Sequence, residues 1–172
     1  MAQCNNCVMD DTDPDIKFND EGICNHCLNY KNIIYPIYKK NKQSGIQEII
    51  KRIKRYNKNR NKYDCILGLS GGADSSYLLK VIVENNINPL CVHVDAGWNS
   101  STAVNNIISL VKILNVDLVT TIIDWNEMRD LQLALMESGI PNQDVAQDHA
   151  FFANLYSIAK KFKIRTILNG GN

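Results

Sequence analysis

The middle of the chain contains a short segment with the residue types and spacing of a phosphate-binding loop. Between an apolar run at 65–67 and a helical pattern at 77–83 lie Ser70, Gly71, Gly72, Asp74, Ser75 and Ser76. Adjacent glycines allow a tight turn close to a bound group, and the first amides of the next helix carry partial positive charge. We therefore expect a phosphate group at this turn, with the Asp74 carboxylate holding a magnesium ion that bridges to it.

Two other interpretations of this loop compete with phosphate binding. A Walker A loop needs lysine and Ser/Thr after its last glycine, whereas Ala73 and Asp74 follow Gly72 here. A plain helix N-cap would also use serine or aspartate, because their side chains accept hydrogen bonds from free helix amides. A cap requires one residue, however, and leaves the two adjacent glycines after an apolar strand without explanation.

Four cysteines near the N-terminus form two pairs with the spacing of a zinc ribbon. Cys4 and Cys7 make one Cys-x-x-Cys pair, and Cys24 and Cys27 make another after sixteen intervening residues. Each pair would supply two positions of a tetrahedral site, with a short hairpin between the pairs. We predict a structural zinc site with four thiolates; an iron–sulfur centre and a redox pair are the alternatives.

The remaining two cysteines, Cys65 and Cys91, lie inside apolar strand patterns. A lone cysteine in such a run is usually a small core residue. Neither has a neighbouring base or cation in the sequence that would lower its pKa, so we expect no catalytic thiol at either position.

Length and composition indicate one ordinary domain with a small appendage. Of the 172 residues 45% are hydrophobic and 22% are charged, which suffices for a core. No apolar run approaches the roughly 20 residues of a membrane helix, and the N-terminus lacks the pattern of a signal peptide. We expect a cytoplasmic protein without membrane association.

The net charge is only +1, but the charges are unevenly distributed. Ten Lys or Arg residues lie between Lys39 and Lys62, with Glu48 as the single acid. A helical pattern in this segment predicts a docked apolar stripe with the basic side chains mostly in water, the stripe being Ile46, Ile49, Ile50, Ile53 and Tyr56. The basic face is interpreted either as a solvated surface or as an RNA-phosphate footprint, and residues 57–61 as a polar linker.

The second half of the chain alternates apolar strands with helices. Further strands are expected at 89–95, 118–123 and 164–168, and helices at 102–114, 126–137 and 150–162. Strands that are apolar on both faces and alternate with helices predict a doubly wound parallel α/β sheet, Rossmann-like in layout. Ligands of such sheets bind beyond the carboxyl ends of the strands, where the loop at 70–76, His93 to Asp95, Asp124, and Asn169 to Gly171 would meet.

The Ser-Gly-Gly-x-Asp-Ser pattern at 70–75 resembles the signature of the PP-loop ATP pyrophosphatases, which cleave ATP between the α and β phosphates. The resemblance implies an adenine nucleotide alpha hydrolase-like fold that binds ATP and Mg²⁺. It implies that the loop residues hold pyrophosphate, with Asp74 and Ser70 in catalytic roles and Asp74 on magnesium. His93, Val94 and Asp95 would lie on the adenosine side, and Gly170 in the nucleotide pocket.

Asp148 lies near the start of the helix expected before the last strand. One role for this acid is an N-cap or first-turn residue that is favoured by the helix dipole. The other role is a polar contact to substrate or metal at the rim of the site.

The joint occurrence of the cysteine pairs, the basic helix, the PP-loop and Leu168-Asn169-Gly170-Gly171-Asn172 is similar to the N-acetyl sugar amidotransferases of surface-polysaccharide (lipopolysaccharide) and nonulosonic-acid biosynthesis. The resemblance covers essentially the whole chain. It implies an ATP-dependent enzyme that converts the acetamido group of a free or nucleotide-linked sugar to an acetamidino group. Ammonia would come from a separate glutaminase subunit, and AMP and pyrophosphate would be released.

Within this interpretation the chain divides into a zinc ribbon at 1–30, a basic helical linker at 31–62 and a PP-loop domain at 63–172. Because the family continues beyond the fourth strand, we expect the PP-loop domain to be truncated at its C-terminus. A fourth strand at the edge of the sheet would expose unpaired backbone that admits a partner chain, including a second copy.

The alternative function is that of a PP-loop tRNA-modifying enzyme, either a thiolase or a lysidine-type ligase. Several such enzymes also carry N-terminal Cys-x-x-Cys pairs, and the basic segment would hold RNA. Sulfur transfer in these relatives uses a thiol or cluster in the ATPase domain, however, and no cysteine occurs between Val92 and Asn172. We therefore expect no nucleic acid partner.

Overall fold

The computed structural model describes residues 2–57 and 62–171, apart from the side chains of residues 41–44. The chain forms two compact units, Met1–Ile49 and Ile50–Asn172, and each is described by itself. Residues 58–61, most of the predicted polar linker, lie outside the described part. None of the described helices combines the length and the apolar composition that crossing a bilayer requires.

The first unit is a small loop structure followed by helices. Two isolated antiparallel bridges, Gln3 with Asp10 and Phe18 with Cys24, take the place of the hairpin expected between the cysteine pairs. Cys24 is the N-cap of helix α1 (Asn25–Asn29), and its sulfur accepts a hydrogen bond from the Cys27 amide. One π-helical segment, η1 (Tyr30–Ile34), leads into α2 (Tyr35–Tyr56), which continues into the second unit.

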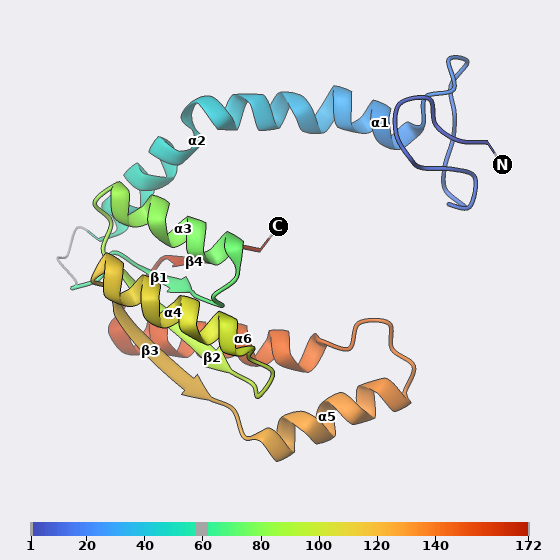
Figure 1. Ribbon diagram of the computed structural model, residues 1–172. Helices are drawn as coiled ribbons and strands as arrows, with labels where there is room; N and C mark the ends of the chain where they lie inside the picture. The colour runs from blue at the N-terminus through green and yellow to red at the C-terminus, as the bar shows by residue number, and fades with distance from the viewer. Residues whose placement is uncertain (1, 58–61, 172) are drawn as a thin grey trace. The chain divides into compact units, whose positions relative to one another are not determined.

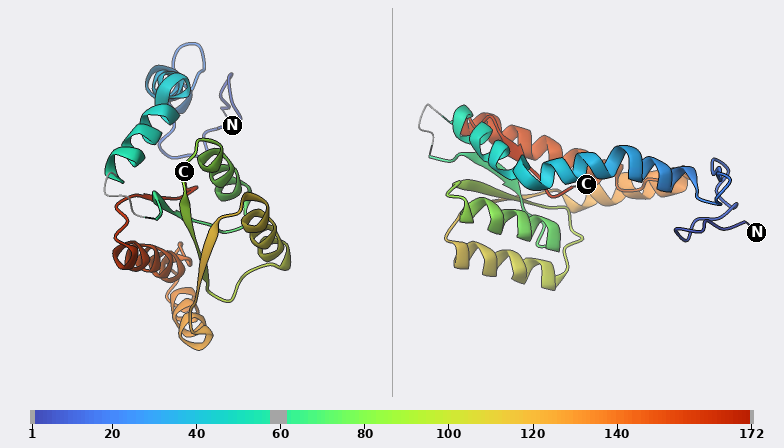
Figure 2. Two further views of the ribbon diagram at one scale, coloured as in Figure 1. Left: turned by 90° about the vertical axis from the view of Figure 1, so that its left-hand side faces the viewer. Right: turned by 90° about the horizontal axis from the view of Figure 1, so that it is seen from above.

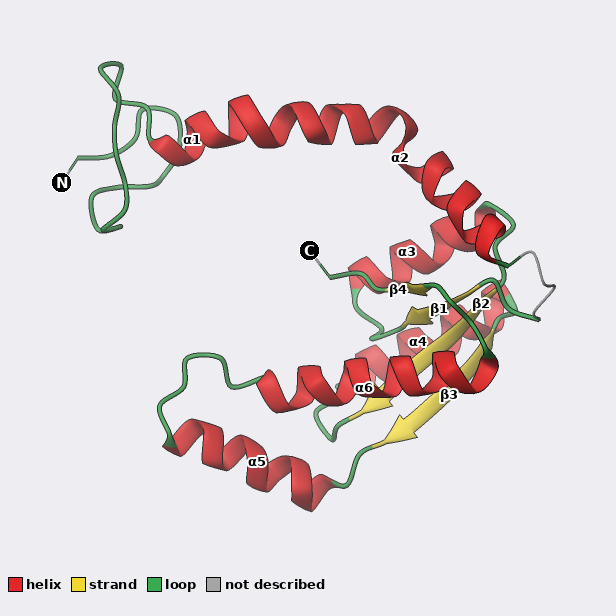
Figure 3. Cartoon of the chain, turned by 180° about the vertical axis from the view of Figure 1, so that it is seen from behind, coloured by secondary structure: helices red, strands yellow, loops and turns green. Residues whose placement is uncertain are grey.

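The second unit contains the predicted parallel sheet. Its strands are β1 (Cys65–Gly68), β2 (Pro89–Asp95), β3 (Asp117–Ile122) and β4 (Ile167–Leu168). They lie in the order β3-β2-β1-β4, and every neighbouring pair is parallel. Figure 3 shows β2 and β3 side by side with their arrowheads at the same end, so their carboxyl ends meet at one edge of the sheet.

Helices cover both faces of this sheet, as predicted. They are α3 (Ala73–Glu84), α4 (Ser101–Leu114), α5 (Trp125–Glu137) and α6 (Val145–Phe162). Figure 1 and the end-on view of Figure 2 show α3 and α4 together on one face and α6 on the other. Along β1, Cys65 and Leu67 pack toward the α3 and α4 layer, whereas Ile66 packs with Leu155 and Ile158 of α6. This alternation explains why the strand is apolar at every position.

The edge strands differ from the expectation. β3 is an edge strand and only partly buried, and its Ile122 is 78% exposed, so the prediction of burial on both faces fails for this strand. β4 begins at Ile167 instead of Ile164. Lys163 adopts a left-handed conformation after α6, and the Ile164 amide bonds back to the Ala159 carbonyl, so this residue closes the helix and cannot start the strand.

The apolar stripe predicted on the basic helix is shorter than expected. Ile50 and Ile53 are buried in the core beside β1, but Ile46, Ile49 and Tyr56 are exposed. The basic residues of this part of α2 face solvent as predicted, namely Lys51, Arg52, Lys54 and Arg55. Two isoleucines one helical turn apart therefore pack the end of α2, which belongs to the second unit, into the core of that unit.

Candidate active site and metal centre

The predicted phosphate loop is the turn between β1 and α3. Gly71 has a φ of +77°, a left-handed conformation that disfavours side chains. A Cβ at this position would lie 2.3 Å from the backbone oxygen of Ala103 on α4. The glycine is therefore required twice, once for the turn and once for the close approach of α4.

Hydrogen bonding at the start of α3 decides between the phosphate-loop and the N-cap interpretations. Its cap residue is Gly72, and no side chain caps it. By contrast, Ser100 accepts the Ala103 amide at the start of α4, and Asp124 accepts two amides at the start of α5. Within the described residues the amides of Ala73 and Asp74 have no acceptor. The serine-rich cap considered above is wrong, and these amides remain available to an anion.

The serines of the loop bind one another and the backbone. Ser75 is 6% exposed, and its hydroxyl lies 3.0 Å from that of Ser70 and accepts the Ser70 amide at 3.2 Å. The Ser76 hydroxyl donates to the Gly72 carbonyl at 2.6 Å. Both side chains therefore shape the turn, while Ser70 stays exposed at its surface.

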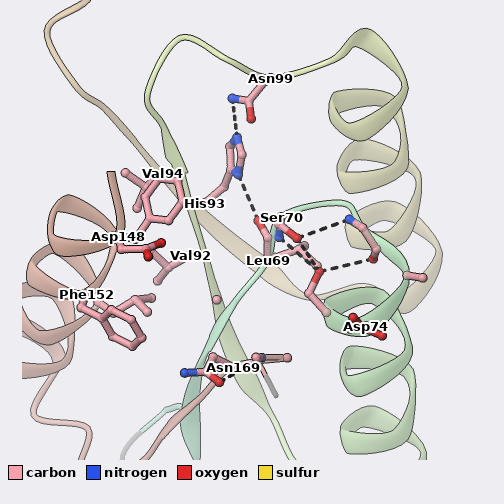
Figure 4. Close-up of a pocket in the computed structure, with 18 residues that line it drawn as sticks. Leu69, Ser70, Asp74, Val92, His93, Val94, Asn99, Asp148, Phe152 and Asn169 are labelled. Atoms are coloured by element: carbon pink, nitrogen blue, oxygen red, sulfur yellow. Dashed lines mark hydrogen bonds between the residues drawn. The ribbon is translucent and has the colours of Figure 1, made fainter. Parts of the chain in front are cut away.

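A cavity of about 410 Å³ opens at the carboxyl ends of the strands beside this loop. Figure 4 shows Ser70 and Asp74 on one side of it and Asp148 and Phe152 of α6 on the other. Asp74 is exposed and has no hydrogen-bond or ion-pair partner among the described residues, so its carboxylate is free to bind a cation. The volume suits a small-molecule ligand.

Seven of the ten predicted nucleotide-site residues line this cavity: Ser70, Gly72, Asp74, Ser75, His93, Val94 and Gly170. Gly71 lies beneath the turn against α4, and Ser76 is turned to the Gly72 carbonyl. Asp95 accepts the Gly97 amide at 2.9 Å and shapes the loop after β2. These three residues shape the loops beside the cavity and do not line it.

His93 lies at the base of the cavity with both ring nitrogens occupied. It is 7% exposed; Nδ1 lies 3.0 Å from the Leu69 carbonyl oxygen, and Nε2 lies 3.1 Å from the side-chain nitrogen of Asn99. A carbonyl can only accept, so Nδ1 carries the proton and Nε2 accepts from Asn99.

Several lining residues were not predicted: Leu69, Asn99, Phe151, Phe152 and Leu155. Asp148, Phe151, Phe152 and Leu155 recur at the spacing of one helix face, which is the signal that sequence reasoning had available. That spacing identifies a face, but only the placement of α6 across β1 and β2 shows that this face looks onto the phosphate loop. Asp148 lies in the first turn of α6 and also lines the cavity, so the structure is compatible with both roles considered for it.

The four N-terminal cysteines come together as predicted. Their sulfur atoms all lie within 4.8 Å of one another, and those of Cys7 and Cys24 are 3.7 Å apart. A tetrahedral metal with bonds of about 2.3 Å separates its sulfur ligands by roughly 3.8 Å. The separation suits metal ligands and is far too long for a disulfide.

The protonation of these thiols also suits a cation. Burial raises the pKa of Cys4, but the amides of Cys24, Asn6 and Cys7 donate to its sulfur and lower it to about 6. The Met9 amide lowers the pKa of Cys7, but burial and the three other thiols raise it to about 12. Adjacent sulfurs therefore resist joint ionisation, and a bound cation would remove that repulsion.

Comparison with known proteins shows the fold. No family model matches the chain. A protein of Methanocaldococcus jannaschii described as uncharacterized is 33% identical over 128 residues, which is 73% of this chain and 44% of that protein.

Two solved structures share the architecture at low identity. An NMN synthetase from Francisella tularensis matches with a TM-score of 0.51 and 19% identity, over 73% of this chain and 52% of that one. An NH3-dependent NAD synthetase from Campylobacter jejuni matches with a TM-score of 0.52 and 15% identity, over 76% and 56%. The second unit therefore shares the parallel, Rossmann-like α/β fold of these two structures. The chain spans about half the length of the proteins it matches.

Proposed function

We propose that this chain is part of an ATP-dependent, AMP-forming amidotransferase that acts on the acetamido group of an N-acetyl sugar. One observation carries the ATP part of the proposal. Among the described residues the amides of Ala73 and Asp74 have no acceptor and the Asp74 carboxylate has no partner, and these groups face one cavity at the carboxyl ends of a parallel sheet. Backbone donors favour an anion and the carboxylate favours a cation, and Mg²⁺-bound polyphosphate combines the two.

The residues of the cavity divide naturally between the parts of ATP. The β and γ phosphates would bind the amides at the start of α3, with Asp74 holding magnesium. The magnesium ion would neutralise charge on the departing pyrophosphate. The apolar wall formed by Val92, Val94 and Phe152 suits the adenosine side. In the reaction the amide oxygen attacks the α-phosphorus, the α–β bridging bond breaks, and pyrophosphate leaves.

Ammonia would complete the conversion. Its nitrogen attacks the carbon of the O-adenylated acetamido group, AMP leaves with the original amide oxygen, and loss of a proton gives the acetamidino sugar. A solved structure with this fold is an NH3-dependent NAD synthetase by name, which supports ammonia as the nitrogen donor. A separate glutaminase subunit is the proposed source. The sugar itself is proposed from the resemblance of the loop, the cysteine pairs and the Asn169-Gly170-Gly171 turn to the sugar amidotransferases.

The cysteine cluster would hold a structural zinc ion. Four thiols complete a tetrahedral shell and leave no open position for a substrate. The ion would bring the Cys4 and Cys24 segments together in a unit where both bridges are isolated. Zinc binding would thus supply folding free energy to a segment with little apolar core.

The tRNA-modifying alternative requires a sulfur carrier if it is a thiolase. Cys65 and Cys91 are the cysteines of the sheet, and both are 0% exposed. Burial raises the pKa of each thiol to about 12. A buried, protonated thiol is a poor nucleophile, and this observation favours the amidotransferase over sulfur transfer.

The reaction itself tests the proposal. The protein is incubated with Mg²⁺-ATP, ammonium ions and a panel of free and nucleotide-linked 2-acetamido sugars, and nucleotides and sugars are analysed by mass spectrometry. We expect sugar-dependent AMP and pyrophosphate, and a sugar product about one mass unit lighter because NH replaces O. Release of ADP and phosphate would refute the AMP-forming mechanism. AMP formation that depends on tRNA and on none of the sugars would refute the sugar as the acceptor and would support the tRNA-modifying alternative.

A further inference from the structure

The imidazole of His93 joins the two loops that border the nucleotide cavity. Its Nδ1 donates to the Leu69 carbonyl at the start of the phosphate loop. Its Nε2 accepts from Asn99 in the loop that connects β2 to α4. Figure 4 shows this chain of hydrogen bonds running from Asn99 through the ring to Leu69. With both nitrogens occupied and only 7% exposure, the ring has no free polar atom for a ligand.

The contact with Leu69 fixes one peptide plane of the phosphate loop. A peptide group is planar, and its carbonyl and amide point in opposite directions. The Leu69 carbonyl points to His93, and the Ser70 amide on the other side of the plane donates to the buried hydroxyl of Ser75. The plane is therefore held at both ends, and it cannot rotate without breaking two hydrogen bonds.

Two other loop carbonyls, those of Gly71 and Gly72, also accept hydrogen bonds from protein side chains. Asn106 on α4 donates to the Gly71 carbonyl at 3.0 Å, and Ser76 donates to the Gly72 carbonyl. A carbonyl oxygen turned into the cavity would repel a phosphate, because both carry negative charge. Holding these carbonyls by donors keeps the loop in the form that presents amides to an anion.

We propose that His93 is a positioning residue: it holds the Leu69–Ser70 peptide in the anion-binding orientation and ties the phosphate loop to Asn99, and it does not contact the base of the nucleotide. The inference rests on the proposed function in that the anion is the pyrophosphate part of ATP. It differs from the family-based expectation, which assigns His93 to the adenosine side. Imidazole suits this role because one rigid ring carries a donor nitrogen and an acceptor nitrogen whose hydrogen bonds point in different directions.

Two probes separate positioning from base contact. Inorganic pyrophosphate with Mg²⁺ has no base, and adenosine has no phosphate. We expect His93→Ala to weaken pyrophosphate and ATP alike, by about 10-fold to 100-fold, as for loss of a buried hydrogen bond, and to leave adenosine binding within about threefold. Calorimetry measures all three affinities. Weakened adenosine binding with unchanged pyrophosphate binding would overturn the proposal.

Conservative variants test which nitrogen matters. The side-chain nitrogen of asparagine reaches the place of Nδ1, whereas the end of glutamine reaches the place of Nε2. We expect His93→Asn to restore most of the pyrophosphate affinity and His93→Gln to restore little. The reverse order would contradict a role through Leu69. His149→Ala, an exposed histidine on α6 that does not line the cavity, is the matched control and should bind as wild type does.

A spectroscopic measurement tests the contact without any ligand. Long-range ¹H–¹⁵N spectra of the ligand-free protein should show His93 with its proton on Nδ1, and Asn99→Ala should leave that proton in place. A proton on Nε2 would refute the contact with Leu69. If wild type binds neither pyrophosphate nor ATP, the proposed function fails. The tautomer and the shift of the Ser70 amide in His93→Asn then decide separately whether the histidine holds the loop.

Discussion

A Cβ atom on Gly170 would lie 2.9 Å from the amide nitrogen of Ser75. The turn after β4 therefore passes directly against the start of α3, where the free helix amides lie. This contact brings the last strand, more than ninety positions away in the chain, to the phosphate loop. Gly170 therefore contributes to the site because it has no side chain that would separate the two backbones.

Gly170→Ala should damage nucleotide binding by pushing these backbones apart. The new methyl group meets backbone atoms of Asp74 and Ser75, which cannot move aside as a flexible side chain would. We expect ATP affinity to fall at least about tenfold, with a strain cost of about 1–3 kcal/mol. Gly171→Ala is the control, because its Cβ would meet only the Asn169 side chain at 3.4 Å. Equal effects of both substitutions in titration calorimetry would contradict this explanation.

Asp74→Asn should abolish pyrophosphate release. The amide keeps the shape of the side chain but removes the charge that would hold magnesium, and we expect at least about a hundredfold lower turnover, or about 2.7 kcal/mol. Glu84→Gln at the other end of α3 removes an acid that pairs with Lys80 at the surface and should change little. Enzymatic detection of pyrophosphate compares the two. Normal turnover by Asp74→Asn would eliminate the assigned metal role.

Cys24→Ser should remove one zinc ion per chain and loosen the first unit alone. The sulfur of Cys24 is fully buried within the cluster, and a hydroxyl is a poor zinc ligand. The control is Cys65→Ala, a substitution in the sheet, and this variant should retain the zinc ion of the first unit. Elemental analysis gives the metal content, and hydrogen exchange gives the stability of each unit. Iron instead of zinc in the wild-type protein would refute the assignment of zinc. Faster hydrogen exchange throughout the second unit of Cys24→Ser would contradict a role of the metal that is confined to the first unit.

Ile53→Ala should destabilise the second unit, and Ile49→Ala should not. Ile53 is 1% exposed beside β1, whereas Ile49 is 47% exposed on the same helix. Truncating a buried isoleucine costs about 2–5 kcal/mol, and a surface substitution changes stability by roughly 0.5 kcal/mol or less. Urea unfolding measures both. A similar loss in the two variants would mean that the stripe docks over its whole predicted length.

The buried thiols predict a loss of stability at high pH. The pKa of Cys65 and of Cys91 is about 12 in the folded protein, above the ordinary value of 9.0. Between pH 9 and 12 the unfolded chain loses these protons and the folded chain keeps them, so the free energy of unfolding falls by up to about 1.4 kcal/mol per pH unit and thiol. The fall should be smaller in Cys65→Ala/Cys91→Ala than in wild type. If the free energy of unfolding falls equally steeply with pH in both proteins, burial does not raise the pKa of these thiols.

The sequence alone determined the order of strands and helices in the second unit and the position of its glycine turn. β2 has the predicted bounds, and α4 and α5 begin within one residue of prediction. Their apolar runs are long, and turns or capping residues bound them, so local physics suffices. The spacing of Cys4, Cys7, Cys24 and Cys27 likewise predicted that four thiols come together, and the structure confirms their proximity.

Only the tertiary structure decided what lies next to the loop. Whether Ile122 is buried depends on β3 lying at an edge of the sheet, and which face of α6 covers the cavity depends on how α6 crosses β1 and β2. His93 reads in the sequence as a ligand at a strand end, but its neighbours Leu69 and Asn99 occupy both of its nitrogens. Residue types and spacing specify which groups are available for chemistry. Contacts between segments distant in the chain decide which of those groups remain free to bind, since each hydrogen bond within the protein removes a donor or an acceptor from the site.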